Sequence, residues 1–186
     1  MKVVVTEFVT LDGVFQDPGG AGEFDRGGWA FRFDRGSEGD KFKLDELIAA
    51  DAQLLGRKTY DGFAAAWPSM TDEAGFAEKM NSMPKYVVSS TLTEPTWNNT
   101  TVIGFDDVAK LRAEPGGDLL VAGSGRLVQA LLASGLVDEL HLMVFPVVLG
   151  AGRRLLEAGS SEAPFELLEA RPSGQTTIMV LRAKRE

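Results

Sequence analysis

Short apolar runs and amphipathic stretches take turns along this chain, and their alternation predicts an α/β fold. Runs rich in β-branched and aliphatic residues predict strands at residues 3–8, 52–55, 85–90, 100–103, 118–122 and 139–149. Apolar residues at helical spacing predict helices near residues 44–48, 61–66, 74–80, 106–113 and 127–132. Because strands that alternate with helices build parallel sheets, we expect a mixed, mostly parallel central sheet with helices on both faces.

The end of the chain adds a different kind of strand pairing. Residues 165–170 and 176–183 predict two strands joined through Pro172 and Gly174, which makes a C-terminal antiparallel hairpin. Pro146 interrupts the run 139–149 and predicts a bulge or a sheet edge there. Since no linker, internal repeat or low-complexity tract divides the chain, we expect residues 1–186 to form a single domain.

The segment 13–39 fits neither pattern. It holds eight glycines and five aromatic residues, and it exceeds the length of about 12–15 residues at which unstructured loops in compact domains become uncommon. Loops of this kind are lids, binding loops or disordered segments, and the aromatic residues argue against disorder. We expect either a lid or a structural loop anchored in the core.

Composition narrows the classes of function. The net charge of −8, from 19 basic and 27 acidic side chains, makes nucleic acid and anionic membrane poor candidates for partners. No cysteine is present, which excludes disulfides and thiol chemistry and favours a cytoplasmic location. The start of the chain lacks the features of a signal peptide, and no apolar run approaches the roughly 18 residues of a membrane span. We expect a soluble protein that acts on a small molecule.

A single histidine limits the chemistry further. His141 lies in an alternating strand pattern, where a polar position on one sheet face is the simpler interpretation. A Ser-His-Asp triad could form only through this residue, and neither a thiolate site nor a multi-histidine zinc site can be built. We therefore expect no metal site, and difficult chemistry would come from a bound cofactor.

Two stretches with the same build indicate what that cofactor is. Residues 52–60 and 119–127 are each an apolar run that stops at glycine, places an arginine after it and then becomes amphipathic. This pattern is typical of a strand, a tight turn and the first turn of a helix, where free N–H groups and the helix dipole attract anions. Glycine allows close approach and arginine forks onto phosphate oxygens. Two such turns suggest a dinucleotide.

Neither turn is a complete nucleotide motif. Val128 stands where the G-x-G-x-x-G fingerprint requires glycine or alanine, and no Gly-Lys-Ser/Thr of a P-loop follows. Ser89 and Ser90 add hydroxyl groups at a third strand end. The three strand ends would present donors at the carboxyl side of one sheet, where α/β proteins bind ligands.

Together these motifs resemble a known superfamily. Gly56-Arg57-Lys58-Thr59-Tyr60, Val87-Val88-Ser89-Ser90 and Gly123-Ser124-Gly125-Arg126 are similar, in order and spacing, to the cofactor motifs of dihydrofolate reductases. The opening Thr10-Leu11-Asp12-Gly13 and the stretch 145–153 resemble one branch, the reductase domain of the bifunctional riboflavin-biosynthesis deaminase–reductase and its stand-alone relatives. The resemblance covers residues 3 to about 181 and implies a dihydrofolate reductase-like three-layer α/β fold.

The resemblance implies NADPH as the cofactor. Arg57, Ser90 and Arg126 would meet its 2′-phosphate, and Lys58, Thr59 and the N–H of Gly125 its pyrophosphate. The same motifs bring Gly56, Ser89, Gly123, Ser124 and Leu127 into the expected cofactor site. The alternatives are a solvated helix face for the basic residues and ordinary turns for the serines.

Other residues are candidates for the substrate side of a hydride transfer. Asp12, at the mouth of the first strand, is the candidate for orienting or protonating substrate, or else half of an ordinary Asp-Gly turn. Trp29 and Phe33 would stack on a flat heterocycle or anchor the loop. Gly150, Gly152 and Arg153 would form a second anion site for a substrate phosphate, or a glycine-assisted hairpin.

The resemblance leaves the substrate open. A deaminase half with its histidine and cysteine zinc ligands is missing, and Asp40 lies near the acidic pterin anchor of folate reductases within a different local sequence. The pyrimidine intermediate of riboflavin biosynthesis is favoured over a pterin, a folate or an unassigned substrate. A non-catalytic NADPH-binding protein and a structural dimerisation module are the alternatives from other classes. The strand around His141 and Phe145 would support a homodimer.

Overall fold

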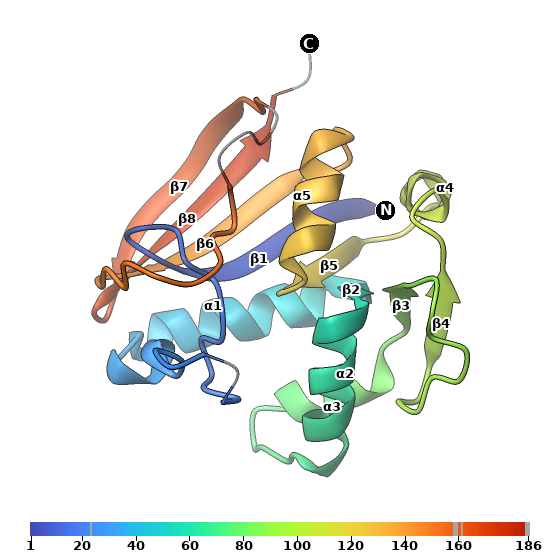
Figure 1. Ribbon diagram of the computed structural model, residues 1–186, viewed down its shortest axis with the longest axis horizontal. Helices are drawn as coiled ribbons and strands as arrows, with labels where there is room; N and C mark the ends of the chain where they lie inside the picture. Colours follow the sequence, from blue (N-terminus) through green and yellow to red (C-terminus); the bar gives the residue numbers. More distant parts are fainter. Residues whose placement is uncertain (23, 158–159, 161, 185–186) are drawn as a thin grey trace.

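An eight-stranded sheet forms the centre of the computed structural model, which describes residues 1–22, 24–157, 160 and 162–184 (Figure 1). Its strands are, in chain order, β1 (Lys2–Thr10), β2 (Ala50–Gly56), β3 (Lys85–Val88), β4 (Thr100–Ile103), β5 (Asp118–Ala122), β6 (Glu139–Phe145), β7 (Phe165–Ser173) and β8 (Thr176–Ala183). They lie in the order β4-β3-β2-β5-β1-β6-β8-β7. All neighbours run parallel from β4 to β6, and β8 and β7 add antiparallel pairs. The predicted mixed sheet with a C-terminal hairpin is confirmed.

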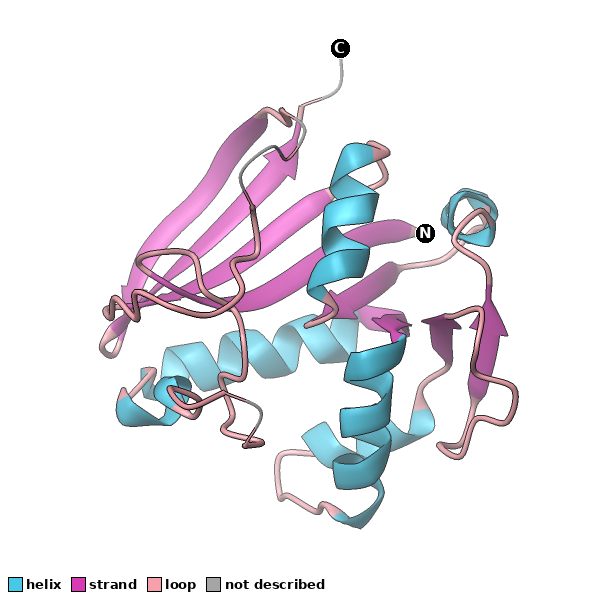
Figure 2. Ribbon diagram, viewed as in Figure 1, coloured by secondary structure: helices cyan, strands magenta, loops and turns pink. Residues whose placement is uncertain are grey.

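Helices cover both faces of this sheet, as the alternating pattern predicted (Figure 2). Val4 packs with side chains of α1, α2 and α3, whereas Val3 and Val5 pack with side chains of α4 and α5. Successive side chains of a strand point to opposite faces, so the two groups of helices form separate layers. The helices are α1 (Gly36–Ala49), α2 (Arg57–Ala66), α3 (Phe76–Ser82), α4 (Asp107–Ala113) and α5 (Gly125–Ala133), with the short 3-10 helices η1 (Trp29–Arg32) and η2 (Trp67–Ser69).

Helix α1 begins well before the apolar spacing near residue 44 predicted. Its first turns are polar and glycine-rich, and tertiary contacts with the β7–β8 turn hold them. The hydroxyl of Ser173 donates a hydrogen bond to the carbonyl oxygen of Arg35 at 2.6 Å. A Cβ atom on Gly39 would lie 3.1 Å from the Ser173 Oγ, so only glycine lets the helix approach this turn so closely. A sequence window cannot register a contact made across more than a hundred residues.

Strand β6, around which a homodimer was predicted, is an inner strand of the sheet. The strand lies between β1 and β8, and Phe145 at its end is buried. Pro146 follows the last residue of β6 and so ends the strand rather than forming a bulge within it. The residues around His141 and Phe145 offer no free edge for a second copy, because the edges of the sheet belong to β4 and β7. Within the described ranges, no helix is both long and apolar enough to cross a membrane.

Candidate functional site

The two glycine turns lie side by side at the carboxyl edge of the sheet. They follow β2 and β5, which are neighbouring parallel strands. The backbone N–H of Gly56 donates to the Ser124 Oγ at 2.9 Å, and the backbone N–H of Ser124 donates to the Thr59 Oγ1 at 2.8 Å. The expected juxtaposition of the turns is therefore confirmed. The hydroxyls of Thr59 and Ser124 hold the turns to each other.

Close approach explains the glycine in the second turn. Gly123 has φ +58°, and a Cβ atom there would lie 3.1 Å from both the Oγ1 and the Cγ2 of Thr59. Ser124 also has a left-handed backbone, with φ 60°. Side chains disfavour this conformation, so the hydrogen bonds to Ser124 hold a backbone that is otherwise costly.

Basic side chains stand at the starts of the two helices that follow the turns. Arg57 is the first residue of α2, and its Nε donates to both carboxylate oxygens of Asp61 at 2.8 Å. Arg126 is the second residue of α5; it is exposed and has no hydrogen bond or ion pair with any described residue. Lys58 is exposed on α2. A helix start is the positive end of the helix dipole, so these cations add to a field that already attracts anions.

The two serines after β3 differ in what they can offer. The Ser89 Oγ accepts hydrogen bonds from the backbone N–H groups of Thr91 and Leu92, at 3.2 and 3.1 Å, and so closes the local turn. Ser90 is exposed beside it. Because β3 pairs with β2, both serines lie on the same edge as the glycine turns. Of the pair, Ser90 is the residue with a hydroxyl available to a ligand.

Phe15 covers the start of α5, which the sequence did not indicate. A Cβ atom on Gly125 would lie 2.1 Å from the Phe15 Cζ, so the ring rests directly on this glycine. The Arg153 guanidinium lies 5.6 Å from the ring centroid on Phe15, and the Phe15 N–H donates to the Arg153 carbonyl oxygen at 3.1 Å. The Phe15 ring thus lies against the glycine that was predicted to contact the pyrophosphate. Leu127, also predicted to contact the cofactor, is buried in the core beneath α5.

Asp12 braces two loops. Its carboxylate accepts hydrogen bonds from the Thr10 hydroxyl at 2.6 Å and from the N–H groups of Leu149 and Gly150 at 3.1 and 2.9 Å. The bond from Thr10 and then those from the backbone lower the pKa of Asp12 to about 2. A carboxyl group with this pKa is ionised at neutral pH, so Asp12 has no proton to donate to a substrate. These contacts give Asp12 a structural role and oppose the protonating role, while the orienting role stays a prediction.

The same contacts correct the second anion site predicted near residue 150. The Gly150 N–H already serves Asp12, and the Arg153 N–H donates to the Gln16 Oε1 at 2.9 Å. A Cβ atom on Gly152 would lie 2.8 Å from the Val14 side chain. The backbone N–H groups of Gly150 and Arg153 are thus engaged in holding the loop, and the exposed Arg153 guanidinium remains as a group that could bind an anion.

Trp29 anchors the aromatic loop. Its side chain is buried, and its indole N–H donates to the Gln16 carbonyl oxygen at 2.9 Å. Its ring meets the Phe145 ring edge-on, with 5.3 Å between centroids. Trp29 has no exposed face for a substrate, so the stacking role is corrected to anchoring. Phe33 is half-buried against the same Phe145 ring, with 6.2 Å between centroids.

Known proteins are similar to this chain in sequence and in fold. A model of the RibD C-terminal domain family matches residues 1–179. The chain belongs to this family. It is 32% identical over 160 residues to the uncharacterized protein YyaP of Bacillus subtilis (strain 168), covering 83% of this chain and 79% of YyaP. It is 26% identical over 174 residues to the uncharacterized protein YwjB of the same organism, covering 94% and 93%.

Solved structures share the fold of this RibD C-terminal domain. A putative riboflavin biosynthesis protein from Shewanella sp. PV-4 matches over the whole of both chains, with a TM-score of 0.76 and 23% identity. Acinetobacter baumannii RibD (form 2) matches with a TM-score of 0.61 and 19% identity over 98% of this chain. This chain spans 58% of the length of that RibD chain. Family membership supports a reductase-like domain of riboflavin biosynthesis, and an oxidoreductase in general.

A cluster of polar side chains lies between α1 and the sheet of this RibD C-terminal domain. Residues far apart in the sequence form it. Glu46 of α1 accepts hydrogen bonds from Thr6 at 2.9 Å, contacts the His141 Nδ1 at 2.7 Å and pairs with the Lys43 Nζ at 2.8 Å. Burial acts to raise the pKa of Glu46, but the Lys43 charge and the hydrogen bonds from His141 and Lys43 lower it overall. His141 is the polar strand position that the alternation predicted, and its buried partner was missed because Glu46 lies far away in sequence.

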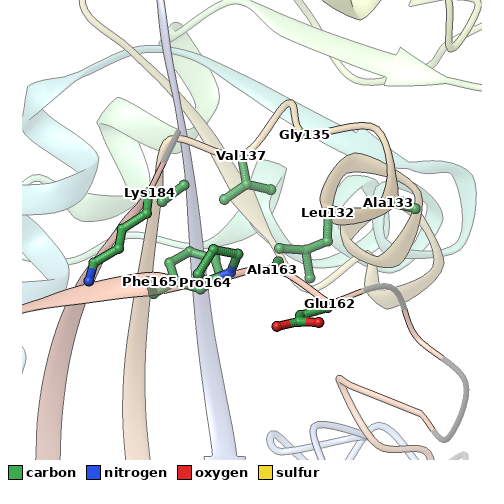
Figure 3. A pocket seen from close by; sticks show the side chains of 10 residues that line it. Leu132, Ala133, Gly135, Val137, Glu162, Ala163, Pro164, Phe165 and Lys184 are labelled. Atoms are coloured by element: carbon green, nitrogen blue, oxygen red, sulfur yellow. The ribbon is translucent and has the colours of Figure 1, made fainter. Parts of the chain in front are cut away.

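A shallow hollow lies at the other end of α5, away from the glycine turns (Figure 3). Leu132 and Val137 line one side, and Pro164 and Phe165 line the other. Leu132 is near the last residue of α5, whereas Gly125 is its first. The hollow is therefore separate from the candidate site by the length of the helix.

Proposed function

We propose that this protein is an NADPH-dependent reductase that transfers a hydride to a small heterocyclic or ribosylamine substrate. The pyrimidine intermediate of riboflavin biosynthesis is the first candidate substrate. Membership of the RibD C-terminal domain family supports the reaction class. One geometric observation carries the cofactor: Ser124 joins the two glycine turns by hydrogen bonds to Gly56 and Thr59, so the helix starts behind them face one region.

The residues at these turns fit a dinucleotide that carries an extra phosphate. The N–H groups in the first turn of α2 have no partner within the helix and suit the pyrophosphate. Arg126 has an uncommitted guanidinium for the 2′-phosphate, with Ser90 as a hydroxyl donor from the neighbouring strand end. Arg57 would exchange Asp61 for the phosphate. An exposed pair of this kind is worth only about 0.3–0.5 kcal/mol, so a phosphate can compete for it.

The protein's own contribution to the reaction is to bind, orient and exclude water. When bound, the reduced nicotinamide supplies the hydride. The two loops that carry Phe15 and Arg153 contact each other, and the Phe15 ring rests on the start of α5; together they would shield the reacting groups from solvent. Asp12 holds the base of the loop that carries Arg153 through Leu149 and Gly150. Asp40 is exposed and paired with Arg35 at 2.7 Å, so it does not form the buried acidic anchor that a pterin would need.

Binding measurements test the cofactor first. We expect NADPH to raise the melting temperature more than NADH does, because only NADPH carries the phosphate that Arg126 and Arg57 would bind. Arg126→Ala should remove most of this preference, whereas Arg182→Ala, at an exposed arginine of β8, should leave it intact. Equal shifts with both nucleotides, or none, would contradict the proposal. Turnover is then followed by NADPH absorbance with the pyrimidine intermediate and, separately, dihydrofolate.

A further inference from the structure

A buried carboxyl group lies directly beneath the second glycine turn. Glu7 of β1 is 5% exposed. Thr6 pairs with Ala122 of β5, so the next residues along the two parallel strands, Glu7 and Gly123, are neighbours. Val5 and Val9, which share the strand face of Glu7, belong to the core that α4 and α5 cover. Glu7 therefore points into an apolar layer at the start of α5.

One oxygen of this carboxyl group has no partner. The backbone N–H of Gly123 donates a hydrogen bond to the group, but Oε1 is fully buried and bonds to none of the described residues. Buried polar atoms in native proteins nearly always have a partner, because an unpaired one costs free energy. The exception therefore calls for a reason, and a ligand that completes the bond is one.

The protonation state decides what the free oxygen offers. Burial raises the pKa of Glu7 well above its ordinary value of 4.5, while the Lys43 charge and the Gly123 N–H lower it by less. Burial therefore favours the neutral, protonated form of this carboxyl group over the ionised form. Because the Gly123 N–H needs an oxygen that accepts, the protonated form would carry its proton on Oε1. In that form Oε1 is a buried donor without an acceptor among the described residues, next to the point where β5 ends.

The chain connections diverge at these two neighbouring strands. From β1 the chain passes through α1 on one face of the sheet to β2, and from β5 it passes through α5 on the other face to β6. The neighbouring carboxyl ends of β1 and β5 therefore form a topological switch point, the usual ligand site of open α/β sheets. Glu7 and Gly123 flank this switch point, one from each strand.

We propose that Glu7 is a ligand-contacting residue, whose neutral carboxyl group donates a hydrogen bond from Oε1 to an amide-type carbonyl oxygen of a ring bound between the ends of β1 and β5. The inference rests on the proposed reductase function and deepens it. The nicotinamide carboxamide and a ring carbonyl of the substrate carry the same chemistry. Glu7 lies on the α5 face, under the turn assigned to the cofactor, which favours the carboxamide. Phe15, resting on Gly125, would have to move for the ring to enter.

Other charged groups around Glu7 are already paired or lie farther out. Lys43 of α1 pairs with Glu46, and His141 of β6 also contacts Glu46. His141 lies beside Thr6 in the sheet, so its side chain is on the opposite face from Glu7. Asp12 is tied to the loop 149–150, and the remaining charges nearby are the exposed Arg126 of α5 and Arg153. Of these groups, Lys43 carries the charge that lowers the pKa of Glu7.

Two substitutions of Glu7 test the proposed hydrogen bond separately from the burial of the side chain. Glu7→Gln keeps the shape and an N–H donor but cannot ionise, whereas Glu7→Leu removes the donor. We expect the NADPH affinity of the natural protein to fall as the pH rises through the ionisation of Glu7. Glu7→Gln should bind with similar affinity and without that pH dependence. Glu7→Leu should bind about tenfold more weakly, the loss expected for one hydrogen bond.

The outcomes distinguish the two ligand sources and the two proposals. If both variants bind NADPH normally but the KM for substrate rises in Glu7→Leu, the partner is the substrate carbonyl. If the natural protein binds NADPH and both variants match it in affinity, turnover and pH profile, the inference about Glu7 is wrong while the proposed function stands. If the natural protein does not bind NADPH, both are wrong. Should Glu7→Leu fail to fold, the pH profile of Glu7→Gln alone decides.

Discussion

The hydroxyl oxygen of Ser124 accepts a hydrogen bond from the backbone N–H of Gly56 at 2.9 Å, and this contact joins two turns that are 68 residues apart in the chain. The same serine donates its own N–H to the Thr59 Oγ1. Each of the two segments thus supplies a side-chain oxygen that accepts a hydrogen bond from a backbone N–H of the other. The pair fixes the spacing of the α2 and α5 helix starts, on which the proposed cofactor site depends.

Removing this hydroxyl should loosen both turns. We expect Ser124→Ala to lower the free energy of unfolding by about 1–2 kcal/mol, because the Gly56 N–H loses its partner. NADPH binding should weaken as well, since the helix starts would no longer be held together. Urea denaturation measures the first effect and titration with NADPH the second. Ser90→Ala, at an exposed hydroxyl, is the control for the unfolding measurement. Its free energy of unfolding should stay within about 0.5 kcal/mol of that of the natural protein.

The contact between Phe15 and Gly125 predicts a coupled pair. Gly125→Ala would bring a methyl group within 2.1 Å of the Phe15 ring, so we expect a loss of stability of about 1–3 kcal/mol from overpacking. In a Phe15→Leu background the same substitution should cost less, because the smaller side chain can yield. A double-mutant cycle measures this coupling. Additive effects of the two substitutions would show that the ring does not rest on the glycine in solution.

The hydrogen bonds of Asp12 predict how the stability of the protein changes at acidic pH. The pKa of Asp12 is lowered from 3.8 to about 2, so the ionised form stabilises the fold at pH values above 3.8. This contribution is lost as the pH falls from 3.8 toward 2 and the carboxylate takes up a proton. Asp12→Asn should be less stable at neutral pH and should lose less stability over that acid range. Unfolding curves at several pH values test this, and parallel curves for the two proteins would contradict the bracing role.

The contacts of Glu46, on the α1 face of the sheet, predict a stronger effect on stability when this residue is replaced. Glu46→Leu removes the acceptor of Thr6 and leaves the half-buried Lys43 charge without its partner; losing one side of a fully buried pair costs about 3–5 kcal/mol, which is the upper limit expected here. Because the pKa of Glu46 is lowered from 4.5, its stabilisation is present above that pH and fades below it. Thermal unfolding reports the loss. Asp45→Leu, at an exposed neighbour on α1, is the matched control and should change stability little.

Local pattern was sufficient for the strands and for the helices whose apolar residues recur at helical spacing. The strand ends at Gly56 and Gly123 were predicted from glycine and arginine after an apolar run, and both turns form there. The start of α1 was missed, because its polar first turns are held by Ser173 and the β7–β8 turn and not by an apolar stripe. Local propensity cannot report such a contact.

The residues of the candidate site also fall into two groups: those whose positions follow from local sequence and those whose roles depend on distant contacts. Arg57, Arg126 and Ser90 lie where strand ends and helix starts should put them. Asp12 and Trp29 were assigned to chemistry because their residue types suit it, yet a loop brace and a core anchor use the same types. Phe15 and Glu7 were passed over, since nothing adjacent in sequence marks the glycine that each contacts.

The sequence by itself determined the class of fold, the positions of the two glycine turns and the family resemblance, because these follow from periodicity and from short motifs that act through neighbouring residues. Only the tertiary structure decided which polar side chains are free to meet a ligand. Whether a carboxyl group is braced by hydrogen bonds or left with an unpaired oxygen depends on burial and on partners from distant segments, and folding alone brings those partners together.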